Sequence, residues 1–249
     1  MLPVGLYDLL EIEHASRSSF ISNVAELKGD SSNLVIRAAE LFQGATSIQT
    51  THEIRLEKNI PIGAGLGGGS SNAAATLRLL NQLHNRPLGD ERLKELAADL
   101  GSDVAFFLYG QSALCTGRGE QIEPSHFSRN LWICLFKPGF GLSTRDAYRA
   151  YAALSNDRKR GREEETQWGR LRNDLEPAVF SKYLLLPVIK EWLKKQAETL
   201  FALMSGSGST MFAIVRSQME GEKLRDRFRG EFDDQTWAAV CRLNPPSLQ

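Results

Sequence analysis

The chain has 249 residues, enough for one large domain or two smaller ones, and its 42% hydrophobic and 24% charged residues are typical of soluble globular proteins. Its 30 basic and 30 acidic side chains cancel, so no overall field would attract nucleic acid or an anionic membrane. Three widely spaced cysteines, Cys115, Cys134 and Cys241, exclude a disulfide scaffold and favour a reducing compartment. No apolar run could span a bilayer, and the first residues do not resemble a signal peptide. We therefore expect a soluble, cytoplasmic protein.

Helical and strand patterns are mixed through the first half of the chain. In chain order they predict a helix over 33–43 that ends at Gly44, a strand over 52–58, a glycine-rich segment at 61–69, a helix over 70–84, a helix over 90–100 capped by Asp90, and short apolar elements at 103–110 and 112–117. The helix over 70–84 is amphipathic and starts directly after the glycines.

The second half of the chain has a different pattern of apolar and charged residues. Its patterns predict a strand over 131–139, a helix over 144–154, a solvated charged loop over 156–167, a helix near 187–199, and a glycine-serine run within 204–215 that leads into a strand. The mixture predicts an α+β chain with two lobes, divided into residues 1–129 and 130–249.

The glycine-rich segment, "PIGAGLGGGSSN", has five glycines among the seven positions from Gly63 to Gly69. Because a helix N-terminus offers unpaired N–H groups and partial positive charge, glycines there allow an anion to reach the backbone. A flexible linker is the alternative, but a strand before the run and a helix after it favour a phosphate cradle. The spacing fits the dinucleotide fingerprint only formally, because "KNIPI" separates the strand from the first glycine, and it lacks the Walker lysine.

The segment "P-x-G-x-G-L-G-G-G-S-S-N-A-A" resembles the phosphate loop of the GHMP small-molecule kinases, named for galactokinase, homoserine kinase, mevalonate kinase and phosphomevalonate kinase. It is most similar to the branch that phosphorylates 4-diphosphocytidyl-2-C-methyl-D-erythritol (CDP-methylerythritol) in the non-mevalonate (MEP) isoprenoid pathway. Further segments agree in order: "SNLVIRAAELF" at 32–42, "GSDVAFFLYG" at 101–110, "NDLE" at 173–176 and "LMSGSGSTMFAI" at 203–214. The resemblance implies a two-lobed kinase fold, ATP with Mg²⁺, and a small-molecule partner rather than nucleic acid or membrane.

The resemblance also implies roles for individual residues. Asp103 would be the catalytic base, although alone it also suits a helix or turn cap. Tyr148 would stack on cytosine, or it could belong to the core with Tyr151. The residues implied to bind ATP or its phosphates are Pro61, Gly63, Gly65, Leu66, Gly67, Gly68, Gly69, Ser70, Ser71 and Asn72 in the glycine-rich segment, Gly206, Ser207 and Gly208 in the second run, and Asn33 and Lys58 near the adenine or ribose.

Several alternatives stay open at this point. Asn33 equally suits a helix cap, and Lys58 a solvated strand end. No metal ligand is assigned, because ATP would carry most of the magnesium coordination; Ser70 is the one side chain offered. The four histidines, His14, His52, His84 and His126, are scattered in the sequence and receive no chemical role.

The family pattern opens with "P-A-K-x-N-x-x-L" and "R-x-D-G-Y-H", whereas "MLPVGLYDLLEIE" resembles the stretch just after them. We therefore expect the first strand of the N-terminal sheet to be absent. Either the start is misassigned or shortened in a full kinase, or the chain is a non-catalytic ATP-binding relic. Another GHMP kinase of homoserine or mevalonate type is the alternative activity, and the sequence leaves monomer or homodimer open.

Overall fold

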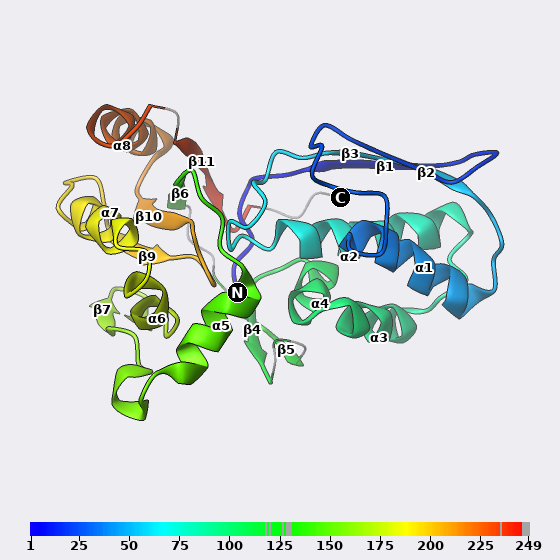
Figure 1. Cartoon of the computed structure of the whole chain (residues 1–249), viewed down its shortest axis with the longest axis horizontal. Helices are drawn as coiled ribbons and strands as arrows, with labels where there is room; N and C mark the ends of the chain where they lie inside the picture. The colour runs from blue at the N-terminus through cyan, green and yellow to red at the C-terminus, as the bar shows by residue number, and fades with distance from the viewer. Residues whose placement is uncertain (118, 120, 126, 128–130, 235, 246–249) are drawn as a thin grey trace. The chain divides into compact units, whose positions relative to one another are not determined.

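The computed structural model describes all residues except 118, 120, 126, 128–130, 235 and 246–249 (Figure 1). The described residues form two compact units: the first comprises residues 1–60 and 67–127, and the second comprises 61–66 and 131–245. The glycine-rich segment is thus divided, since 61–66, expected in the first domain, group with the second unit. The expected boundary between 129 and 130 stays a prediction, because it falls outside the described residues.

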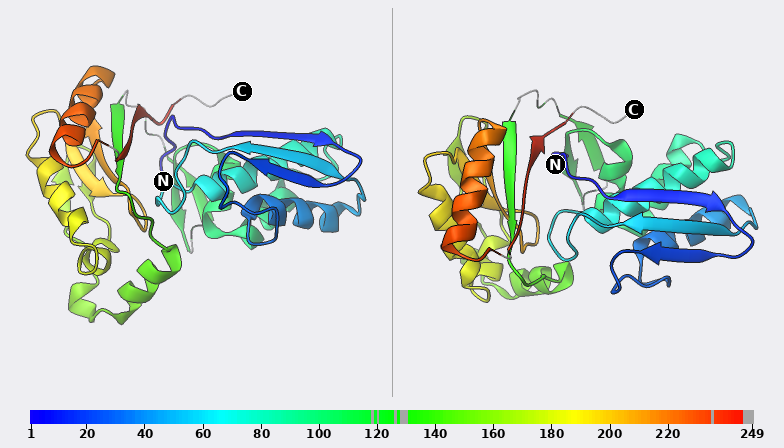
Figure 2. Two further views of the ribbon diagram at one scale, coloured as in Figure 1. Left: turned by 45° about the horizontal axis from the view of Figure 1, so that its top comes forward. Right: turned by 90° about the horizontal axis from the view of Figure 1, so that it is seen from above.

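The first unit is built on a three-stranded sheet of β1 (Leu9–His14), β2 (Ser19–Ser22) and β3 (His52–Glu57). The central strand, β3, pairs antiparallel with β1 and parallel with β2 (Figure 2). Its alternate residues His52, Ile54 and Leu56 are buried, which confirms the period of two read from the sequence.

Helices cover one face of this sheet. They are α1 (Leu34–Thr46), α2 (Gly68–Leu83), α3 (Asp90–Leu100) and α4 (Ser102–Tyr109), followed by a hairpin of β4 (Ala113–Thr116) and β5 (Gln121–Pro124). Their shared core includes Phe42, Leu77, Leu80, Leu96 and Val104. The helices meet there through apolar faces at helical spacing.

Three local predictions need correction. Helix α1 runs past Gly44 to Thr46, because an interior glycine costs a helix only about 1 kcal/mol and the chain turns instead at Ser47. Asp90 is the first residue of α3, and Gly89 is its N-cap. The apolar element at 103–110 is the helix α4, which ends at Gly110.

The second unit contains an antiparallel sheet in the order β11-β6-β10-β9. The strands are β6 (Leu131–Lys137), β9 (Phe201–Met204), β10 (Met211–Val215) and β11 (Trp237–Leu243). Helices α7 (Leu185–Lys194) and α8 (Gln218–Glu231) pack on the sheet through Leu193 and Phe228 (Figure 2). These contacts give this unit a core of its own.

The remaining elements of this unit connect β6 to α7. They are α5 (Thr144–Ala153), η1 (Asn156–Arg158), β7 (Glu164–Thr166), β8 (Gly169–Leu171) and α6 (Glu176–Phe180). The stretch 156–167, expected to be a loop, therefore contains a turn of helix and a short strand, because β7 pairs with β8. Within the described ranges, no helix is long and apolar enough to cross a membrane.

Candidate functional site

The N-terminus of α2 forms the centre of the candidate site in the first unit. Gly67 is the N-cap, and the first turn reads Gly68, Gly69, Ser70, so its N–H groups are not covered by large side chains. A Cβ added to Gly68 would lie 2.9 Å from the Nζ of Lys58. This close approach explains the glycine, and the positive end of α2 is suited to bind an anion.

Asp103 lies on α4, which packs against α2. A Cβ on Gly67 would lie 2.6 Å from Cε2 of Phe107, so the Phe107 ring packs against Gly67. Asp103 is four residues before Phe107 and shares its helix face. Asp103 therefore lies on the side of α4 that carries Phe107 toward Gly67.

The environment of Asp103 suits a base. The side chain is accessible to solvent, yet partial burial raises its pKa above the ordinary aspartate value. A carboxylate with a raised pKa holds a proton more firmly and is a better acceptor in general-base catalysis. The alternative role as a cap is not supported, since the N-cap of α4 is Gly101 and has no side-chain hydrogen bond.

Asp8 links the segments that surround this site, a role that the sequence analysis missed. One of its oxygens, Oδ2, accepts from Lys58 Nζ at 2.5 Å and from Asn72 Nδ2 at 2.9 Å. The other, Oδ1, accepts from the backbone N–H groups of Asn59 at 2.7 Å and Ile60 at 2.8 Å. Asp8 thereby ties the start of β1 to the end of β3 and to the first turns of α2.

Two residues expected near the adenine or ribose have their polar groups engaged within the first unit. Asn33 is the N-cap of α1: its Oδ1 accepts from Val35 N at 3.0 Å and its Nδ2 donates to Lys28 O at 3.1 Å. The Lys58 side chain is only 5% exposed and is paired with Asp8, so it does not lie on a solvated strand end. Contact of either residue with a nucleotide stays a prediction.

The second unit brings the other half of the glycine-rich segment against the second glycine-serine run. Ser205 Oγ donates to Gly65 O at 2.9 Å, and Thr210 N donates to Ala64 O at 3.1 Å. On the other side, Leu142 N donates to Gly63 O at 3.1 Å. Gly65 therefore lies beside Gly206 and Gly208, while Gly63 lies beside Gly141 and Leu142.

Gly65 shows why this contact requires glycine, since its φ is +71°. A Cβ there would clash with Ser205 O and would lie 2.7 Å from Gly208 O. We expect Gly65→Ala to lower stability by at least about 1–2 kcal/mol from the left-handed backbone alone, and to weaken ATP binding. Thermal unfolding and ATP titration measure both. Gly139→Ala, at an exposed position with open space around it, is the matched control and should change neither.

The tetrapeptide at 173–176 holds the glycine-serine run in place through side-chain hydrogen bonds. Asn173 Nδ2 donates to Met204 O at 2.9 Å and to Gly206 O at 2.7 Å. Glu176 Oε1 accepts from Met204 N at 3.0 Å, while its Oε2 pairs with the buried Lys190 at 2.7 Å. The sequence analysis quoted this tetrapeptide without a role, and the structure shows that its side chains position the run.

Tyr148 is exposed on α5, with 57% of its surface accessible. Tyr151, one turn on, packs against the core of the second unit, so the alternative of a core role applies to Tyr151 and not to Tyr148. Nearby, Thr144 Oγ1 and the buried Ser207 Oγ lie 3.0 Å apart, which joins the start of α5 to the glycine-serine run. An exposed aromatic ring of this kind is free to stack on a ligand.

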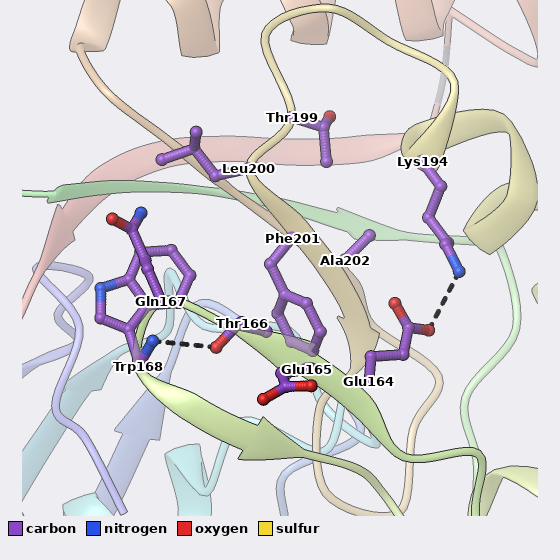
Figure 3. A pocket seen from close by; sticks show the side chains of 10 residues that line it. All are labelled: Glu164, Glu165, Thr166, Gln167, Trp168, Lys194, Thr199, Leu200, Phe201 and Ala202. Carbon is purple, nitrogen blue, oxygen red and sulfur yellow. Dashed lines mark hydrogen bonds and ion pairs between the residues drawn. The ribbon is translucent and has the colours of Figure 1, made fainter.

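A pocket of about 350 Å³ in the second unit lies apart from these residues (Figure 3). It is lined by Glu164, Glu165, Thr166, Gln167, Trp168, Lys194, Thr199, Leu200, Phe201 and Ala202. An ion pair of 3.1 Å joins Lys194 Nζ to Glu164 Oε1. None of the residues predicted for the site lines this pocket, so its volume does not identify the site.

Comparisons with known proteins place these features in one family. The model of the GHMP kinases N terminal domain matches residues 33–111, and that of the GHMP kinases C terminal matches 147–234. A 4-diphosphocytidyl-2-C-methyl-D-erythritol kinase of Methylacidiphilum infernorum is 43% identical over 221 residues, covering 88% of this chain and 77% of the relative. The chain belongs to the GHMP kinase family.

Two further comparisons support membership of this GHMP kinase branch. A 4-diphosphocytidyl-2-C-methyl-D-erythritol kinase of Bacillus subtilis is 36% identical, covering 92% of this chain and 79% of the relative. A crystal structure of 4-(cytidine 5'-diphospho)-2C-methyl-D-erythritol kinase gives a TM-score of 0.80 at 28% identity, covering 98% and 88% of the two chains. The homoserine kinase of Cytophaga hutchinsonii, at 22% identity and a TM-score of 0.74, shares the fold.

Proposed function

We propose that this GHMP kinase transfers the γ-phosphoryl group of ATP to the tertiary 2-hydroxyl of CDP-methylerythritol, a step of isoprenoid precursor synthesis. The observation that carries the proposal is the position of Asp103 on α4, one turn before Phe107, whose ring packs against Gly67 at the start of α2. The names of relatives that are 33–43% identical support the choice of substrate.

In this reaction Asp103 accepts the proton of the substrate hydroxyl as the oxygen attacks the γ-phosphorus. The bond between that phosphorus and the bridging oxygen breaks, and ADP leaves with the electron pair. N–H groups at the start of α2 stabilise the charge that develops on the phosphoryl oxygens. The proton transfer is late, so a carboxylate with a raised pKa is sufficient as a base.

The phosphate-binding residues proposed belong to the two glycine-rich runs. In the first unit they are Gly67, Gly68, Gly69, Ser70, Ser71 and Asn72, and in the second Pro61, Gly63, Gly65, Leu66, Gly206, Ser207 and Gly208. Asn72 acts indirectly, because its side-chain amide donates a hydrogen bond to Asp8. Ser207 acts through its backbone, since its hydroxyl is held by Thr144.

The donors at α2 also fit a magnesium-nucleotide. A serine hydroxyl such as Ser70, in the first turn of α2, is the hard oxygen ligand that Mg²⁺ accepts beside phosphate oxygens and water. When bound, the ion neutralises phosphate charge.

Tyr148 is the proposed cytosine platform. Base–aromatic stacking is worth about 1–3 kcal/mol, so Tyr148→Ala should weaken substrate binding by about 5- to 150-fold. Because the ring does not touch the phosphates, KM for ATP should stay constant. Tyr148→Phe keeps the π face and is the matched control. Steady-state kinetics check this, and an unchanged KM for CDP-methylerythritol in the alanine variant would remove Tyr148 from the substrate site.

The choice of substrate is tested by a panel. ADP release would be measured with Mg-ATP and CDP-methylerythritol, homoserine or mevalonate, separately and in competition. Turnover of CDP-methylerythritol, and of neither homoserine nor mevalonate, supports the proposal. Preference for homoserine or mevalonate would assign another GHMP activity. We place the reaction in the cytoplasm, where cysteine thiols stay reduced, and we leave monomer or homodimer as a prediction.

A further inference from the structure

Three histidines that are scattered in the sequence come together in the first unit. His14 ends β1, His52 starts β3 directly opposite it, and His84 is the C-cap of α2. Their side chains offer ligand nitrogens that all lie within 4.8 Å of one another. Among the described residues this three-histidine cluster is the one group of three or more possible metal-ligating side chains.

The nitrogens face one another. His52 Nε2 and His84 Nε2 are 2.9 Å apart, and the three ring centroids are separated by 5.1–5.6 Å. Two nitrogens at this distance can share only one proton. The Thr50 hydroxyl lies 3.2 Å from His52 Nε2 and 3.3 Å from His84 Nε2, so it serves the same two imidazoles.

Packing holds two of the three imidazoles in place. His52 is buried, with 4% exposure, and His84 stacks on Phe42. Neutral imidazole is the form that binds metal ions.

We propose that His14, His52 and His84 bind a divalent transition metal, with Zn²⁺ as the best-suited ion, through one nitrogen each. Three imidazoles suit zinc, and a water on the exposed His14 side would supply a fourth ligand. Zn–N bonds of about 2.0–2.1 Å in a tetrahedron place nitrogens about 3.3 Å apart. The observed 2.9 Å between His52 Nε2 and His84 Nε2 needs only a small widening, and the nitrogen of His14, within 4.8 Å of the other two, would move closer to them.

The metal site is structural and remote from the chemistry. His84 follows the last residue of α2 and Gly67 precedes the first, so the 16 residues of the helix separate them by roughly 24 Å. A bound ion would link the paired ends of β1 and β3, at His14 and His52, to the C-terminal end of α2. It would therefore stabilise the first unit without entering the phosphoryl transfer.

The test uses the full chain without an affinity tag. Co²⁺ is the spectroscopic probe, because four-coordinate Co²⁺ absorbs strongly in the visible range, and Zn²⁺ added afterwards should bleach that band. We expect one equivalent of metal and a melting temperature that rises with Zn²⁺. His52→Gln and His84→Gln should each weaken binding by at least about 100-fold and abolish the rise.

His126→Gln removes the fourth histidine of the sequence and is the matched control; it should bind Co²⁺ like the wild type. Circular dichroism verifies that each variant is folded. Because His14 is exposed, His14→Gln removes one metal ligand without disturbing the core. Absence of a visible Co²⁺ band in the wild type, or equal binding by all variants, would overturn the proposal. ADP release is followed separately, so failure of the metal site is distinguishable from failure of the kinase activity.

Discussion

Asp103→Asn should abolish phosphoryl transfer while ATP binding stays nearly unchanged. The amide has almost the same shape and cannot accept the proton, and loss of a general base lowers kcat by about 10²- to 10⁴-fold. Because the Asp103 side chain is accessible, the neutral variant should fold normally. Single-turnover ADP release and ATP titration measure the two properties independently.

The pH profile provides a second readout for Asp103. A base works only when ionised, so activity is present above its pKa and is lost as the pH falls through it. Burial raises the pKa of Asp103, so the acid limb should lie above the ordinary aspartate value of about 3.9. Asp99→Asn, an exposed aspartate on α3, is the matched control and should keep both rate and profile. Equal loss of ATP binding and activity in Asp103→Asn would show that Asp103 is structural.

Asp8→Ala should destabilise the protein more than any exposed substitution. The Asp8 and Lys58 side chains are 1% and 5% exposed, so removal of the carboxylate leaves a buried ammonium unpaired. Breaking a buried pair in this way costs about 3–5 kcal/mol, and two backbone N–H groups also lose their acceptor. Chemical denaturation measures the change in the free energy of unfolding.

Two comparisons make the Asp8 result specific. Glu13→Ala removes an exposed partner of Arg55, at 3.7 Å, and should cost no more than about 1 kcal/mol. Asp8→Asn combined with Lys58→Met removes both charges and should recover part of the loss, because neither partner is left ionised. A loss below about 1 kcal/mol in Asp8→Ala would contradict the role assigned to this ion pair.

Local patterns predicted the elements that carry the glycine-rich segment. The strand at 52–58 and the helix after the glycines were recognisable because each depends on the spacing of apolar residues that are close in the sequence. The α+β class and the family followed from the same motifs. Helix α4 was not recognised, because an apolar run of eight residues fits a buried strand as well as a buried helix.

Contacts between distant parts of the sequence could not be predicted in this way. The role of Asp8 depends on Lys58, 50 positions later, and no local pattern links the two. The histidines at 14, 52 and 84 appeared scattered, and only the β1–β3 register and the end of α2 bring them together. The tetrapeptide at 173–176 was visible as a motif, but its contacts with Met204 and Gly206 required the fold.

The most direct test of the account is ADP release by the purified 249-residue chain with Mg-ATP, with and without CDP-methylerythritol. The account predicts release that depends on the substrate, together with one phosphoryl group gained by CDP-methylerythritol in the mass spectrum. A folded chain that binds ATP but releases no ADP with this substrate would contradict it.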